Sequence, residues 1–236
     1  LNAGTAGVSG ELVFSTGTTS NGASGSISIG TGTTTGLGES GDIHVHVGKT
    51  TVEDGGQIWL EAGRTTTNKN GGLFNVQAGS SDGPGLGIGG HLNLLSGHAT
   101  TNTGGSLSLI SGFSTASTSG SIIIRTLNAG TAGVSGELVF STGTTSDGAS
   151  GSISIGTGTA SEGDGGDIAI VVGDGNVRDG GHIYLYAGKS NALATSGATG
   201  GSISLISGFG TASTSGSIII RTLNAGTAGV SGELVF

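Results

Sequence analysis

One pair of histidines is the first candidate for chemistry in this sequence. His44 and His46 stand two residues apart, so in an extended segment both side chains project from the same face. A zinc or copper site needs a third and a fourth ligand close by. His91, His98 and His182 stand apart without matching pairs. We therefore expect solvent-facing histidines and no metal centre.

An acidic string offers a second possibility. Gly163–Ile168 reads Gly-Asp-Gly-Gly-Asp-Ile, a partial match to the glycine- and aspartate-rich nonapeptide that binds calcium in β-rolls. The aspartates do not recur every nine residues here, and most repeats lack them. A plain acidic turn is the expected structure, and calcium binding stays an alternative.

Threonine pairs suggest a third chemistry, the binding of ice. Thr16 with Thr18 and Thr31 with Thr33 are spaced as in the Thr-x-Thr arrays of ice-binding proteins. Val47 with Lys49 interrupts the array, and other repeats also depart from it. Ice binding is the leading alternative function, ahead of calcium or glycan binding.

The residue types and their spacing do not indicate a catalytic site. Serines are abundant, but none stands out from the repeat as a nucleophile beside a base. No helix is expected after a Gly-x-Gly-x-x-Gly string, so nucleotide binding is not indicated. We expect no enzyme activity and no cofactor.

These residues lie in copies of one repeated phrase or in the connectors between them, and the phrase is typified by Gly25–Gly32 (Gly-Ser-Ile-Ser-Ile-Gly-Thr-Gly). Residues two and four places after the first glycine are apolar in every copy, and the sixth place is small or β-branched. Connectors of turn-forming residues, such as Thr33–Glu39, separate the phrases. The phrases begin at Gly10, Gly25, Gly41, Gly56, Gly72, Gly90, Gly105, Gly120, Gly136, Gly151, Gly166, Gly181, Gly201, Gly216 and Gly232.

The alternation predicts half-buried strands and an all-β fold. We expect a parallel β-solenoid of 15- to 16-residue strand-plus-arc units, with two strands (about 31 residues) per turn and two facing sheets. Leu1–Thr33 recurs as Leu127–Thr159 and Gly105–Phe140 as Gly201–Phe236, at offsets of eight and six phrases. We expect one continuous array over 1–236, cut from a longer chain, with an antiparallel meander as the alternative.

Composition narrows the possible partners. The 236 residues include 53 glycines and no cysteine, only 9% are charged, and the formal net charge is −8. Nucleic-acid binding requires a basic patch, which is missing. No apolar run has the roughly 20 residues of a membrane helix, so membrane insertion is not expected.

Large apolar side chains at outward third and fifth places are the candidate surface for lateral packing between copies of the chain. Most phrases carry polar or small residues there. Scattered surface hydrophobes would explain them equally well. The candidates are Trp59, Leu95, Ile110, Ile123, Tyr184, Tyr186, Ile206 and Ile219.

Strings such as Gly201–Gly208 and Asn128–Gly136 resemble the long Gly/Ser/Thr-rich repeat surface proteins predicted in diatoms and related microalgae. The resemblance covers the whole chain and brings no catalytic residues. It implies an extracellular structural rod that self-associates into a cell-surface filament, hair or adhesive fibre. Serine and threonine hydroxyls could also carry O-linked glycans.

Overall fold

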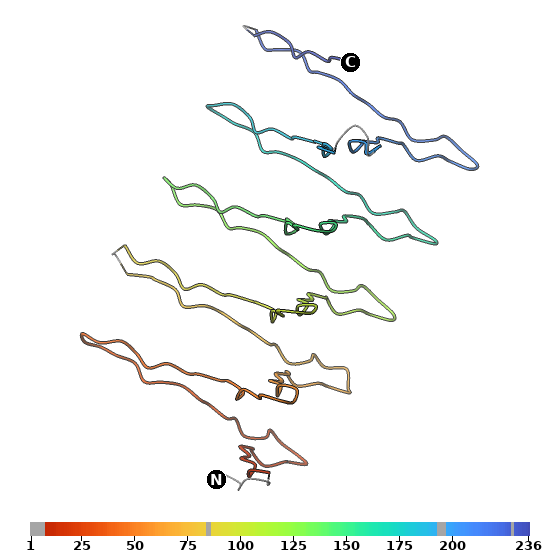
Figure 1. Ribbon diagram of the computed structural model, residues 1–236. Helices are drawn as coiled ribbons and strands as arrows, with labels where there is room; N and C mark the ends of the chain where they lie inside the picture. The colour runs from red at the N-terminus through yellow and green to blue at the C-terminus, as the bar shows by residue number, and fades with distance from the viewer. Residues whose placement is uncertain (1–7, 84–85, 193–196, 228) are drawn as a thin grey trace. The chain divides into compact units, whose positions relative to one another are not determined.

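The computed structural model describes residues 8–83, 86–192, 197–227 and 229–236 (Figure 1). The chain divides into two units, Leu1–Ile122 and Ile123–Phe236. Over the described ranges no residue belongs to an α-helix or a β-strand. No helix there has the length and hydropathy needed to cross a lipid bilayer.

The expected parallel β-solenoid is therefore wrong. The phrases are not strands, and no two facing sheets form in the described residues. The antiparallel alternative also requires strands and is not observed. Register between strands is weakly specified in glycine-rich segments, and these phrases are nearly interchangeable. Alternation alone therefore does not select one pairing of phrases over another.

The apolar core expected between the sheets is also missing. No described residue is buried. Second-place side chains such as Ile27 and Ile168 are each 53% exposed, and fourth-place Ile29 is 77% exposed. Without a second layer against which to pack, these side chains remain in contact with water.

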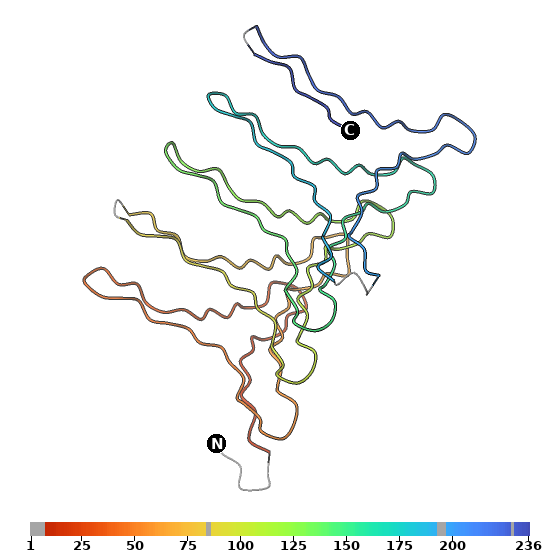
Figure 2. The same cartoon turned by 45° about the horizontal axis from the view of Figure 1, so that its top comes forward.

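The connectors are bends, as the turn-forming residues predict. Figures 1 and 2 show extended paths joined by narrow loops. The bends of the described connectors recur with the spacing of the phrases. They lie at 20–22, 36–38, 51–53, 66–69, 83, 86, 100–102, 115–117, 146–148, 161–163, 176–178, 211–213 and 229, and residues 131–132 and 227 form turns.

Each loop is closed at its base, where the first glycine of a phrase meets the sixth and seventh places of the preceding phrase. Gly72 shows why glycine is required. A Cβ added to Gly72 would lie 3.0 Å from the Gly63 nitrogen and 3.5 Å from the Ala62 Cβ. At Gly56 an added Cβ would lie 2.7 Å from a methyl group of Val47. We call this contact the loop closure.

The sixth-place residue determines how the loop closes. Where it is alanine or serine, the next phrase's glycine N–H donates to the carbonyl of the seventh-place glycine. Gly72 N–H, for example, donates to the Gly63 carbonyl at 2.8 Å, as Gly105 N–H does to Gly97. All six such closures have this bond at 2.8 Å, and they pair Gly72–Gly63, Gly90–Gly79, Gly105–Gly97, Gly120–Gly112, Gly201–Gly188 and Gly216–Gly208.

Where the sixth place is threonine or valine, that backbone bond is not formed among the described residues. The β-branched side chain lies where a Cβ on the next glycine would be: a Cβ added to Gly25, for example, would lie 3.4 Å from the methyl carbon of Thr16. Three threonines replace the lost bond with their hydroxyl. Thr16, Thr142 and Thr157 donate to the carbonyl of the following phrase's glycine at 3.1–3.3 Å.

This rule predicts how single substitutions change a loop. Ala62→Thr is expected to break the bond between the Gly72 N–H and the Gly63 carbonyl, because the described loops with a β-branched residue at the sixth place lack this bond. A net hydrogen bond is worth about 0.5–1.5 kcal/mol, so amide exchange at Gly72 should accelerate roughly two- to tenfold. NMR-detected hydrogen exchange measures this directly.

The matched control is Ala62→Ser. Serine occupies the sixth place in loops that keep the backbone bond, such as Ser96 before Gly105. Exchange at Gly72 should stay unchanged in Ala62→Ser. Equal exchange rates in the serine and threonine variants would contradict the rule.

Candidate functional site

The eight residues predicted for lateral packing are all exposed. Exposure ranges from 67% for Tyr184 to 87% for Ile206. Trp59, Leu95 and Ile110 belong to the first unit, and the other five belong to the second. This is the accessibility that an association surface requires, although exposure alone does not identify a partner.

Tyr184 and Tyr186 are brought into direct contact. Their ring centroids are 5.9 Å apart and the ring planes differ by 13°, a stacked arrangement. His182 joins them with its ring centroid 5.6 Å from that of Tyr184. These residues occupy the first, third and fifth places of one phrase, so an extended backbone places them on the same side. The prediction did not include His182, although the same spacing of two would have found it.

Trp59 has a polar neighbour on its own phrase. Its indole Nε1 donates to Glu61 Oε2 at 3.4 Å. Glu61 is two residues further on and therefore lies on the same side of the extended chain. Trp59 as a whole residue is 80% exposed, so its side chain is accessible for packing against another surface.

The second- and fourth-place side chains form another exposed apolar set that the prediction missed. Ile58 and Leu60 flank Trp59 and are 52% and 72% exposed. The sequence pattern assigned them to a core, and the described residues form none. Phrases with outward apolar residues therefore present such side chains on both of their faces.

His44 and His46, the histidine pair considered as metal ligands, do not form a metal site. His44 Nε2 lies 3.8 Å from Asp42 Oδ2, and both side chains are more than 80% exposed. Among the residues that the structure describes, no three His, Asp or Glu side chains are arranged to hold a metal ion. Asp164 and Asp167 of the calcium-like string are among the described residues, so they are not part of such a group either.

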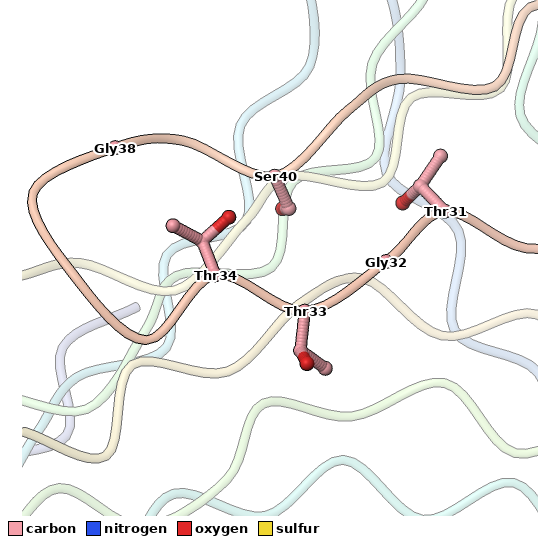
Figure 3. A pocket seen from close by; sticks show the side chains of 6 residues that line it. All are labelled: Thr31, Gly32, Thr33, Thr34, Gly38 and Ser40. Atoms are coloured by element: carbon pink, nitrogen blue, oxygen red, sulfur yellow. The ribbon is translucent and has the colours of Figure 1, made fainter.

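A hydroxyl-lined hollow lies inside one connector loop (Figure 3). It is open to solvent, has a volume of about 470 Å³ and is lined by Thr31, Gly32, Thr33, Thr34, Gly38 and Ser40. Thr31, Thr34 and Ser40 lie on the inner side of the loop, whereas Thr33 points away from it. The Thr34 hydroxyl donates to the Glu39 carbonyl at 3.3 Å. The hydroxyls of Thr31 and Thr33 therefore do not form one aligned row.

Comparison with known proteins supplies no relative from which a function could be carried over. No family model matches the chain, and no significant similarity to a curated protein or to a solved structure was found. Its function is therefore inferred from its residues and their geometry.

Exposure of Trp59, the only tryptophan in the chain, predicts a simple spectroscopic result. In dilute solution its fluorescence should resemble that of a water-exposed indole and should be quenched readily by iodide, because 80% of the residue is accessible. Trp59→Phe supplies the blank for residual tyrosine emission. Blue-shifted emission protected from iodide at low concentration would show that Trp59 is buried within the single chain.

Proposed function

We propose that this protein is a structural protein that self-associates into an extracellular filament, hair or adhesive fibre. The observation that carries the proposal is that every described phrase exposes its apolar side chains and the single chain buries none of them. Burying apolar area contributes about 25 cal/mol per Å². A second copy of the same chain can cover this area.

Repetition favours another copy as the partner. The second and fourth places are apolar in every phrase, so a surface that fits one phrase of a neighbour fits the others. Contacts between different parts of identical chains do not close on themselves when the geometry leaves a free surface at each end. Such contacts generate open filaments, which is the assembly we propose.

Electrostatics does not oppose close packing of copies. Only 9% of residues are charged, and the net charge of −8 is spread over 236 residues. In the phrase Gly181–Gly188, His182 at the first place is the only residue with a titratable side chain besides Tyr184 and Tyr186. Like-charge repulsion between two copies is therefore small at physiological ionic strength.

Backbone groups add a second source of attraction. The described phrases have no strand ladder, so most of their N–H and C=O groups bond to water in the single chain. Extended segments with unpaired backbone groups pair readily with other extended chains. Association can therefore combine apolar burial with hydrogen bonds between copies.

The proposed setting rests on the resemblance to algal repeat surface proteins. A cell-surface or extracellular location suits a chain whose role is mechanical, and O-linked glycans on exposed hydroxyls would suit it as well. Neither an enzyme activity nor a cofactor belongs to this proposal. No observation favours ice, calcium or glycan binding over self-association, and the Thr16 hydroxyl already donates to the Gly25 carbonyl.

The test is electron microscopy combined with sedimentation velocity over a wide concentration range. Wild-type protein should form filaments as concentration rises, and added salt should not dissolve them, because apolar burial drives assembly. Single chains at every concentration would contradict the proposal. Thermal hysteresis with ice shaping by such single chains would favour ice binding over self-association as the function.

Two matched variants show which face is used. Trp59→Ser/Tyr184→Ser/Tyr186→Ser removes the outward aromatic side chains, and Ile58→Ser/Leu60→Ser/Ile183→Ser removes the neighbouring side chains on the opposite face of the same phrases. The outward variant should raise the critical concentration for assembly at least severalfold. A Thr33→Ser variant, which changes no apolar face, should assemble like wild type.

A further inference from the structure

Two duplicated segments of the chain differ at a single residue. Leu1–Thr33 and Leu127–Thr159 are identical except that Asn21 stands where the second copy has Asp147. Each residue is followed by glycine, Gly22 and Gly148. Loss of the side-chain amide from Asn21 would make the two copies identical.

We propose that Asn21 is the preferred site of spontaneous deamidation in this protein. The backbone nitrogen of Gly22 attacks the Cγ of Asn21 and the Cγ–Nδ2 bond breaks. The side-chain amide nitrogen takes up the proton of the Gly22 N–H and leaves as ammonia. The resulting five-membered cyclic imide then takes up one water molecule. Opening at one carbonyl gives aspartate and opening at the other gives isoaspartate at position 21. No oxidant or enzyme is needed, and the chain gains one negative charge.

Local structure favours this reaction at Asn21. Asn21 and Gly22 form part of the exposed bend at 20–22. Gly22 has no Cβ to hinder ring closure, and the nearest atom to that position is the Thr19 Oγ1 at 3.6 Å. No backbone–backbone hydrogen bond to another described residue holds Asn21 or Gly22. The segment can therefore reach the geometry that ring closure requires.

The second copy shows that the loop accommodates the aspartate product. Both loops are closed by the same bond, from Thr16 Oγ1 to the Gly25 carbonyl at 3.2 Å and from Thr142 Oγ1 to the Gly151 carbonyl at 3.3 Å. With aspartate in place, the Thr145 hydroxyl donates to the Asp147 carbonyl at 2.9 Å. Gly148 takes φ +110°, a conformation that glycine adopts without strain.

Asn70 provides an internal comparison, since it is the only other asparagine followed by glycine. The backbone around it is tied on both sides. Lys69 N–H donates to the Thr67 carbonyl at 2.7 Å, and Gly72 N–H donates to the Gly63 carbonyl at 2.8 Å. These bonds restrict the backbone on either side of Asn70 and Gly71, so we expect ring closure at Asn70 to be slower than at Asn21.

The experiment incubates the full chain at mildly alkaline pH, below the concentration for assembly, and follows both sites by peptide mapping with mass spectrometry. Asn21 should convert roughly two- to tenfold faster than Asn70, the factor expected for one net hydrogen bond. Isoaspartate should exceed aspartate at position 21, which marks the cyclic imide. In concentrated denaturant the two rates should become nearly equal.

Variants test the role of the neighbouring residues. Gly22→Val should slow the reaction at Asn21 roughly tenfold, because a β-branched residue restricts the backbone at the attacking nitrogen. Ala62→Thr, which opens the closure near Asn70, should raise the rate there and leave Asn21 unchanged. Conversion of Asn70 first, or equal rates in native buffer, would overturn the proposal. Neither outcome depends on filament formation.

Discussion

The loop closure between consecutive phrases is the interaction on which the described structure depends. It connects the first glycine of one phrase to the sixth and seventh places of the phrase before it, as at Gly72 with Ala62 and Gly63. This contact explains two features of the repeat together. At Gly56 and Gly72 the phrase begins with glycine because a Cβ would meet the opposite leg, and the sixth place, small or β-branched, lies at that contact.

Loop closures organise short stretches of chain but create no interior. Each one spans a single connector, and the phrases between them contribute apolar side chains that no other described part of the chain covers. Burial of apolar surface is the main favourable term in folding and in association. We propose that in this protein contacts between copies supply this term, and we therefore expect assembly and ordering of the phrases to occur together.

Prediction from the sequence succeeded for local features and failed for long-range ones. The connectors bend where turn-forming residues cluster, and side chains such as Tyr184 and Tyr186 share a side as a spacing of two requires. The solenoid was wrong because alternation in a phrase such as Gly25–Gly32 states which side chains share a face but not which segment covers them. Nearly identical phrases offer many equivalent pairings, and no residue type selects one. The role of the sixth place in closing loops was visible as a pattern, but its partner was not.

Hydrogen exchange compared between dilute and concentrated protein tests the central claim most directly. In dilute solution the amides of the loop-closing glycines, such as Gly72 and Gly105, should be slowed while those of the phrase residues exchange freely. On concentration the phrase amides should become protected together, as copies cover one another. Strong protection of the phrase amides at the lowest concentration would contradict this account, because it would place their hydrogen-bond partners within the single chain.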